Sequence, residues 1–320
     1  MPYYPERKPD KPEKRREPQK TAVYRLMRRI LLCLFAGMII YGTVRLTGYG
    51  AELSASKGTS RELQQICDET EPLPDEPAPA AEKTIPPADN DLPETAAERP
   101  AEKKEDSTLP PVPYPDNPGM KVSDRFIRLR KKSGYIIGWI SMDGIEEAVA
   151  LKDNTFFLNH DAEGKKNSNG AIFLDAGTDL LTRPYTVYLY GHNMKSGNMF
   201  GRLKKYLDSA YYFKHRIITF DSLYEDGRYA VFAAAEFSTV SGETDYYDLW
   251  SLDTKDRKNR EQAIRRLTAI NLYDTLLDVR ADEQILLLVT CIDDDTDRLV
   301  IAARRLREGE SENNLNIRKE

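Results

Sequence analysis

A cysteine and an arginine, Cys291 and Arg298, border a short acidic loop between two apolar runs, Ile285–Thr290 and Leu299–Ala303. If the two runs pair as an antiparallel hairpin, Cys291 and Arg298 lie opposite each other, with Cβ atoms roughly 4.5–5.5 Å apart. A fixed guanidinium beside a thiol favours the thiolate and can also bind an oxyanion. A buried core cysteine beside a surface arginine fits the same pattern, so both interpretations stay open on these residues alone.

The sequence offers three histidines as the acid or base that thiol chemistry needs. His192 follows the strand-like run Thr186–Tyr190, so it lies in a loop at the end of a strand, from which a side chain can project into a site. His160 lies in a polar segment, and His215 lies in a charged, turn-like one. We therefore predict that His192 pairs with Cys291. A Cys/His pair beside a cation indicates thiol acyl transfer.

The number and position of the cysteines favour a reactive Cys291. The chain has three cysteines, of which Cys33 lies in an apolar N-terminal segment and Cys67 in a polar region. Cys291 is then alone in the predicted folded domain, which therefore has no disulfide framework. A lone cysteine in an exported domain is more often reactive than structural.

The N-terminus predicts a membrane anchor. Residues 1–29 are rich in Lys and Arg, and residues 30–44 carry no charge. A span needs about 20 residues, so we extend the predicted transmembrane helix over residues 30–49, with Arg45 reaching the interface. A cleavable signal peptide has the same basic-then-apolar order, but no small-residue cleavage site follows. The positive-inside rule then keeps residues 1–29 cytoplasmic and places the rest outside.

Composition separates a tether from a folded domain. Of 19 prolines, all but Pro184 lie at or before Pro118. Residues 50–119, rich in Pro, Ala and Glu, are predicted to be a disordered tether, residues 120–307 the catalytic domain, and residues 308–320 a disordered polar tail. The net charge of −5 and the lack of a basic, aromatic-interleaved patch argue against nucleic-acid binding.

Many short strand-like runs separated by turns predict a mainly β fold, an antiparallel barrel or sandwich. The predicted strands are Tyr135–Ile140, Glu147–Leu151, Ala171–Leu174, Thr186–Tyr190, Arg216–Phe220, Tyr229–Phe237, Ile285–Thr290 and Leu299–Leu306. Short helices are predicted at Asp124–Lys132 and Asn198–Leu207. A longer helix, capped by Asp253 or Thr254 and ending at Asn271, is inserted before the cysteine strand. Its predicted apolar side is Ala263, Ile264, Leu267 and Ile270, and its predicted charged side includes Arg260.

The inserted helix has two interpretations, an amphipathic cover over the barrel or a wall of a substrate groove. The acidic loop Asp293–Asp297 offers oxygen ligands for calcium, but it lacks the spacing and the glycine of an EF-hand. We interpret this loop as solvated, and the sequence predicts neither a metal nor a cofactor.

Three groups of motifs resemble those of class B sortases over about residues 136–306. The first is Leu288-Val289-Thr290-Cys291 followed by Arg298, which is similar to the family's TLxTC strand and its arginine. The others are Tyr190–Met194 with Met199–Tyr206, and Gly138–Ile140 with Phe157–His160 and Gly170–Asp175. The helix inserted before the cysteine strand is a class B feature. The chain departs from the family at Leu287, where the motif has threonine, and at Val289, where many members have a serine that can hydrogen-bond the substrate.

The resemblance implies an eight-stranded sortase barrel on the outer face of a Gram-positive cell membrane. Cys291 would attack the carbonyl after the threonine of a sorting signal, His192 would act as acid and base, and Arg298 would stabilise the oxyanion. The substrates would be surface proteins or pilins, and the acceptor an amine of a lipid-linked peptidoglycan precursor or of a pilin. The resemblance also places Thr290, Asn154 and Leu158 at the signal's groove.

Two alternatives to a transpeptidase remain on the sequence. The first is a cysteine peptidase, a hydrolase that uses the same three residues with water as the acceptor. The second is a non-catalytic binding module at the cell surface.

Overall fold

The computed structural model describes residues 20–69, 109, 114, 116–291 and 296–316, with the side chains of residues 20–25 and 291 left aside. These residues fall into two units that divide between Ala51 and Glu52. The first unit holds the N-terminal part of helix α1 (Lys20–Asp68). From Leu26 onward, α1 is long and apolar enough to cross a membrane, with a mean hydropathy of 1.9. The predicted anchor, residues 30–49, lies within this helix.

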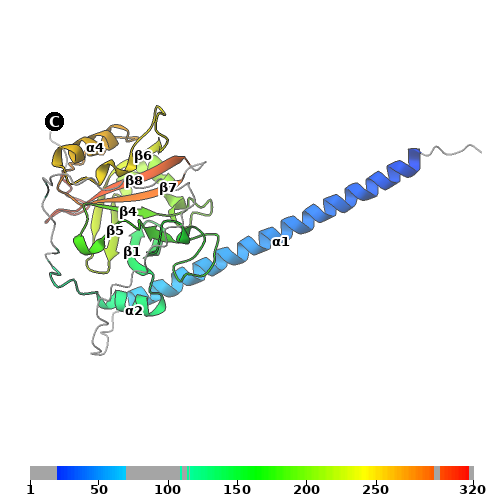
Figure 1. Ribbon diagram of the computed structural model, residues 1–320, viewed down its shortest axis with the longest axis horizontal. Coiled ribbons are helices and arrows are strands. Elements are labelled where there is room, and N and C mark those ends of the chain that lie inside the picture. The colour runs from blue at the N-terminus through cyan, green and yellow to red at the C-terminus, as the bar shows by residue number, and fades with distance from the viewer. Residues whose placement is uncertain (1–19, 70–108, 110–113, 115, 292–295, 317–320) are drawn as a thin grey trace, which may run out of the picture. The chain divides into compact units, whose positions relative to one another are not determined.

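The second unit is built on a closed barrel with the strand order β1-β2-β3-β4-β7-β8-β6-β5 (Figure 1). Neighbours are antiparallel except for the parallel pairs β2–β3 and β4–β7. Each predicted strand overlaps one observed strand, so the barrel is confirmed and the sandwich is excluded. The strands are β1 (Ile136–Met142), β2 (Ile145–Ala150), β3 (Ile172–Leu174), β4 (Thr186–Tyr190), β5 (Ile217–Ser222), β6 (Arg228–Ser238), β7 (Ile285–Cys291) and β8 (Asp297–Arg305).

Short helices connect and flank these strands. The segment predicted to be helical at Asn198–Leu207 is a 3-10 helix that starts at Phe200, and α3 follows it directly. The helices of the second unit are α2 (Asp124–Lys132), η1 (Phe156–Leu158), η2 (Leu180–Thr182), η3 (Phe200–Leu207), α3 (Ser209–Lys214), η4 (Leu249–Leu252) and α4 (Arg257–Ala269), where η denotes a 3-10 helix.

Strand β7 is buried on both faces, which explains its uninterrupted apolar sequence. Leu286 and Leu288 belong to the larger core cluster, which includes residues of β1 to β5. Leu287 and Val289 belong to a second cluster, which includes the buried side of α4. Side chains alternate between the two faces of a strand, so a strand packed on both faces needs an apolar residue at every position.

The insertion before β7 covers this second cluster. In Figure 1, α4 lies beside β6 and β8. Helix α4 begins after Asp256, whose carboxylate accepts a hydrogen bond from Asn259 N, rather than at Asp253 or Thr254 as predicted. It ends at Ala269 rather than Asn271. Three predicted core residues are buried, whereas Ile270 is 39% exposed. The amphipathic cover is therefore confirmed.

Arg260 is buried, contrary to its prediction as part of the charged side of this helix. Its guanidinium donates to the carbonyls of Ala281 (2.7 Å) and Tyr185 (2.8 Å), to the hydroxyl of Thr186 (2.8 Å), and to two further carbonyls. Burial lowers the pKa of Arg260 to about 10. Arg260 lies three residues before Ala263 and four before Ile264, on the helix face that packs inward. The prediction relied on the charge of Arg260, whereas its spacing from Ala263 and Ile264 correctly indicates the buried face of the helix.

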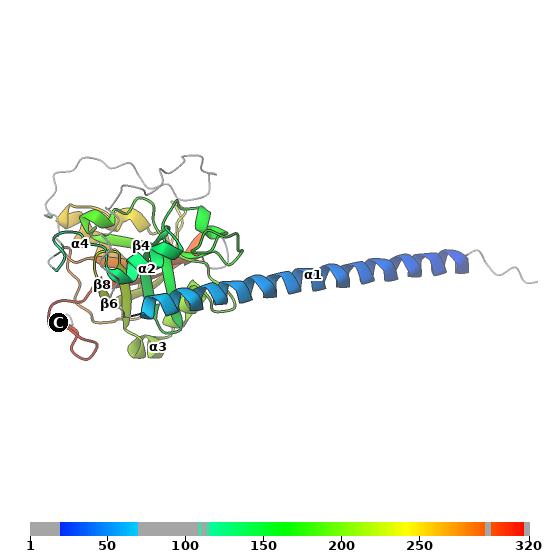
Figure 2. The same ribbon diagram turned by 90° about the horizontal axis from the view of Figure 1, so that it is seen from below.

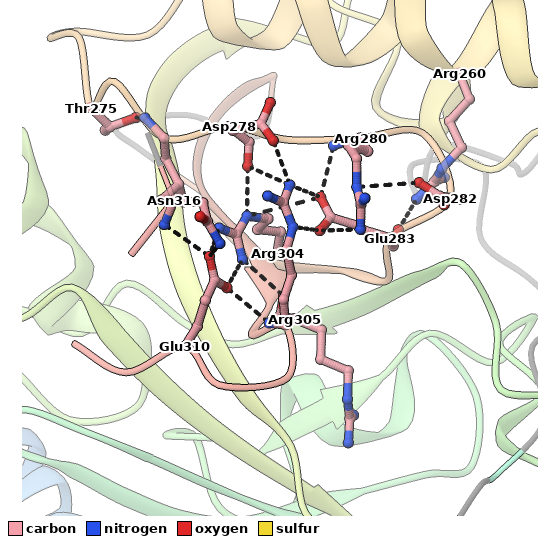
Figure 3. A network of polar contacts seen from close by, with 12 residues as sticks. Arg260, Thr275, Asp278, Arg280, Asp282, Glu283, Arg304, Arg305, Glu310 and Asn316 are labelled. Atoms are coloured by element: carbon pink, nitrogen blue, oxygen red, sulfur yellow. Dashed lines mark hydrogen bonds and ion pairs between the residues drawn. The ribbon is translucent and has the colours of Figure 1, made fainter. Parts of the chain in front are cut away.

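The segment after β8 is folded through residue 316, so the predicted disordered tail is wrong for residues 308–316. Glu310 accepts two hydrogen bonds from the buried guanidinium of Arg304, at 2.7 and 2.8 Å (Figure 3). Burial alone would raise the pKa of Glu310, but the hydrogen bonds from Arg304 and from two backbone amides lower it to about 2. Asp278 N also donates to Asn316 O at 3.0 Å. Residues 317–320 lie outside the described part of the chain.

Helix α1 continues well beyond the predicted anchor, and its end packs on the barrel. Leu63 is 2% exposed within the larger core cluster. Ser60 donates to a carboxylate oxygen of Glu147 at 2.7 Å, and Glu62 pairs with Lys132 of α2 at 2.6 Å. Both views show the end of α1 beside α2 (Figures 1 and 2).

The prediction of a disordered tether is therefore wrong for residues 52–68. The sequence of this segment is mostly polar, and the few small and apolar residues that face the barrel form too narrow a stripe to be recognised without their partner surface. Farther along the predicted tether, Leu109 and Tyr114 are buried as well. Residues 70–108 lie outside the described part of the chain.

Candidate active site

The predicted hairpin exists, and it brings Cys291 and Arg298 together. Strands β7 and β8 are antiparallel, and their register pairs Cys291 with Arg298 at the end of the ladder. Arg298 is half-buried, and its Nη1 donates to Asp297 O at 3.1 Å. The prediction that a cation lies directly across from the cysteine is confirmed at the level of backbone register.

His192 lies at the same edge of the barrel. Strand β4 runs parallel to β7, with Tyr190 opposite Val289, and Gly191 N donates to Val289 O at 3.3 Å. Parallel neighbours end at the same edge of a sheet, so His192, just after β4, lies at the edge where Cys291 ends β7. The two predicted partners therefore come from adjacent strand ends.

The imidazole of His192 is held by a backbone carbonyl. Its Nε2–H donates to Leu158 O at 2.6 Å, and the ring is half-buried. Leu158 ends η1, and its own side chain is 43% exposed beside this contact. The structure thus brings Leu158, a predicted groove residue, next to His192.

The other two histidines have structural surroundings. The ring of His160 stacks on Phe156, with centroids 3.9 Å apart, and its Nδ1 lies 2.9 Å from Phe156 O. The ring of His215 lies against Tyr211, 4.3 Å between centroids. His192 is the histidine that follows β4 at the edge where β7 ends.

Comparison with known proteins agrees with this geometry. The family model for the sortase domain matches residues 147–306, which is half of the chain. The chain belongs to the sortase family. Sortase B of Staphylococcus aureus is 29% identical over 192 residues, covering 58% of this chain and 76% of the relative. Sortase B of Listeria monocytogenes is 26% identical over 176 residues, covering 53% and 68%.

Solved structures give the same assignment. A Bacillus anthracis protein similar to sortase B is 31% identical, with a TM-score of 0.52 over 58% of this chain and 85% of that one. The Staphylococcus aureus sortase B–substrate complex is 27% identical, with a TM-score of 0.52 over 59% and 88%. The protein is therefore a class B sortase, a cysteine transpeptidase.

Asn154 of this sortase stabilises the loop that carries Leu158. Its Nδ2 donates to the Asp175 carboxylate at 3.1 Å, and its Oδ1 accepts from Ala176 N at 2.8 Å. The neighbouring Asp153 accepts a hydrogen bond from Phe156 N at the start of η1. Burial alone would raise the pKa of Asp153, but hydrogen bonds from Thr155 and Phe156 lower it. The two partners of Asn154, Asp175 and Ala176, follow β3, so Asn154 joins its own loop to the segment after β3. Its role in binding the signal stays a prediction.

Thr290 and Val289 lie below the surface of the site. Thr290 is 2% exposed, and its Oγ1 is buried without a hydrogen-bond partner. Val289 is 1% exposed and packs in the cluster that α4 covers. The contact of Thr290 with the signal stays a prediction, and the structure shows that its side chain is buried beneath the surface. The departure at Val289 likewise fills a core and does not open into a groove.

The described part of the acidic loop contains no group of residues that could form a metal site. Across the described ranges, no group of three or more His, Cys, Asp or Glu residues could hold an ion. Asp293–Asp295, the candidate calcium ligands of the loop, lie outside those ranges.

Gly170 is a residue of the site that the chemical reasoning on the sequence missed. Its φ is +63°, a conformation that glycine adopts without strain. A Cβ at this position would lie 2.4 Å from Phe157 O and 3.0 Å from Cδ2 of His192. The signal that could have found it is the Asn-Gly pair at 169–170, which is typical of a turn with positive φ.

We expect Gly170→Ala to lower kcat of peptide ligation by about 10- to 100-fold, because a methyl group there displaces the His192 ring, and small misplacements of a catalytic group have effects of this size. Gly164→Ala is the matched control. Gly164 also has a positive φ, of +82°, but the atoms nearest to its added Cβ belong to Tyr135. Ligation kinetics and thermal unfolding of both variants provide the measurement. Equal kcat values in the two variants would show that Gly170 does not position His192.

Proposed function

We propose that Cys291, His192 and Arg298 are the catalytic residues of a membrane-anchored transpeptidase that acts on sorting signals. The observation that carries this proposal is the backbone register. In this register, Cys291 of β7 lies opposite Arg298 of β8. Strand β4, which precedes His192, runs parallel to β7 and ends beside it.

In the first half-reaction, the thiolate of Cys291 attacks the carbonyl carbon that follows the signal's threonine. The guanidinium of Arg298 stabilises the oxyanion that forms. His192 protonates the leaving nitrogen, so the peptide C–N bond breaks and a thioester remains. The Nε2–H of His192, which donates to Leu158 O, can exchange this acceptor for the leaving nitrogen.

In the second half-reaction, an incoming amine attacks the thioester while His192 takes its proton. A new amide C–N bond forms, the C–S bond breaks, and Cys291 returns as a thiolate. The acceptor is an amino group of a lipid-linked peptidoglycan precursor or of a pilin lysine. The signal-bearing substrates are surface proteins or pilins.

The anchor and the insertion define where the enzyme works. The apolar part of α1 spans the cell membrane once, with residues 1–29 in the cytoplasm because of their positive charge, and with the catalytic unit outside. Leu287 and Val289 of β7 pack in the cluster that α4 covers. Because side chains alternate between the two faces of a strand, Cys291 lies on the same face of β7 as these two residues. We therefore place one wall of the signal groove on the insertion and the other at the exposed Leu158.

The test is acyl transfer from a library of peptides with a threonine before the scissile bond, using the full chain in detergent. We expect the ligated product to appear only when an amine such as triglycine is added, together with a thioacyl adduct on Cys291 that mass spectrometry detects and reads for its motif. A peptidase would release the same acid product at the same rate with or without the amine. That outcome, or the absence of any adduct, would contradict the proposal.

A further inference from the structure

We propose that Glu52, the first residue of the end of α1 that packs on the barrel (Glu52–Asp68), is a positioning residue of the catalytic site. This segment directly follows the predicted span and contacts the turn that backs the His192 ring. The inference rests on the proposed catalytic role of His192. It gives a functional reason for α1 to continue beyond the predicted span and pack on the barrel.

The contact begins at Glu52. The carboxylate of Glu52 accepts hydrogen bonds from the hydroxyl of Ser168 and from Ser168 N, the latter at 3.3 Å. The backbone carbonyl of Glu52 accepts from Nδ2 of Asn167 at 3.4 Å. One residue of α1 therefore binds two successive residues of the 167–170 turn.

Hydrogen bonds within the 167–170 turn connect the residues that Glu52 binds to Gly170, which packs against His192. Oδ1 of Asn167 accepts from the backbone amide of Asn169 (3.0 Å) and from its side chain (2.8 Å), and both residues are buried. Gly170 N donates to Asn167 O at 3.0 Å. Gly170 is packed against the ring, since a Cβ there would lie 3.0 Å from Cδ2 of His192. A shift of the turn therefore moves the surface against which the imidazole rests.

The same turn is also joined to both neighbours of Leu158, whose carbonyl accepts the hydrogen bond from His192. Asn167 N donates to Asn159 O at 2.9 Å, and Ala171 N donates to Phe157 O at 3.0 Å. These two bonds flank Leu158, whose carbonyl accepts from His192. Glu52 thus supports both the packing surface and the hydrogen-bond acceptor of the catalytic histidine.

Other contacts of the helix hold it on the barrel away from this turn. Ser60 bonds Glu147 and Glu62 bonds Lys132, both more than two helical turns beyond Glu52. These contacts stabilise the docked helix without reaching the 167–170 turn. They provide controls that separate docking from positioning.

The position of Glu52 in the chain links the anchor to the site. If the span ends at Tyr49, the fully extended chain allows no more than roughly 11 Å between the Cα atoms of Tyr49 and Glu52. Glu52 is therefore three residues beyond the predicted end of the span in the chain.

The experiment compares Glu52→Ala, Glu52→Gln and Ser60→Ala in the full chain in detergent. We expect Glu52→Ala to lower kcat of peptide ligation by about 10-fold with KM for the peptide within about twofold, since a misplaced catalytic group affects the chemical step more than substrate binding. Glu52→Gln keeps an oxygen that accepts from Ser168, so it should restore kcat. Ser60→Ala should lower the melting temperature while leaving kcat unchanged.

A second variant guards against a folding effect. Ser168→Ala removes the hydroxyl donor from the turn, keeps the backbone donor and leaves α1 intact. It should therefore reproduce most of the loss of kcat and add little to it when combined with Glu52→Ala. Wild-type kcat in both Glu52→Ala and Ser168→Ala would overturn the inference. So would a kcat loss that merely follows the melting temperature across all the variants. A wild-type chain that fails to ligate any peptide would instead contradict the proposed function.

Discussion

Cys291→Ala is expected to reduce amine-dependent ligation by at least about 10⁴-fold, because loss of a covalent nucleophile removes the main reaction path. The substitution keeps the backbone pairing of β7 with β8, so the barrel should stay folded. Ligation rates, circular dichroism and intact-mass analysis after incubation with peptide provide the measurement. No thioacyl adduct should form on the variant.

Cys67→Ala is the matched control for this experiment. Cys67 lies near the end of α1 and is half-buried, and burial raises the pKa of its thiol to about 11. It is therefore protonated and a poor nucleophile at neutral pH. We expect the Cys67→Ala enzyme to keep wild-type ligation. An adduct that maps to Cys67, or activity that survives in Cys291→Ala, would end the assignment of Cys291 as the nucleophile.

His192→Ala should lower kcat/KM for ligation by about 10²- to 10⁴-fold, the range for loss of a general acid and base. The variant loses the group that protonates the leaving amine, so acylation by an amide substrate should be slowest. A peptide thioester with the same sequence needs no such protonation, and its acylation rate should fall much less. Single-turnover acylation measured with both substrates gives this comparison.

His215→Ala provides the control, because the His215 ring packs on Tyr211 of α3. We expect its kcat/KM to stay within about twofold of wild type, as for residues outside an active site. If His192→Ala were to slow the amide and the thioester equally, His192 would act in orientation and not as the acid. If it retained more than a tenth of the wild-type rate, the proposed role would be wrong.

The elements that could be predicted are those whose signals are local. The apolar run of β7, the acidic loop and the run of β8 are close in sequence, and an antiparallel hairpin with a short loop opposes Cys291 and Arg298 without reference to the rest of the chain. The apolar run also correctly predicted a strand, and packing on both faces explains why every position of β7 from Ile285 to Val289 is apolar.

Elements that depend on distant partners could not be predicted. The charge of Arg260 suggested a solvent-exposed residue, but carbonyls from segments far apart in the chain accept its hydrogen bonds in the core. Residues 52–68 looked like a tether because their contacts with the barrel are spread over Leu63, Ser60 and Glu52. Of these residues, only Leu63 contributes with Ile66 to a helical pattern in the sequence, and that pattern is weak.

The sequence by itself determined the chemistry of this protein. A cysteine at the end of a strand, a histidine after another strand and an arginine across a short loop predicted one combination of site residues. The expectation that Cys291 is the single cysteine of the folded domain was wrong, because Cys67 packs on the barrel. The tertiary structure decided how those residues are placed. The parallel pairing of β4 with β7 brings His192 to the cysteine strand, and the contact of Glu52 with the 167–170 turn supports it. Both depend on closure of the barrel, which joins residues far apart in the chain and is therefore not encoded in any local pattern.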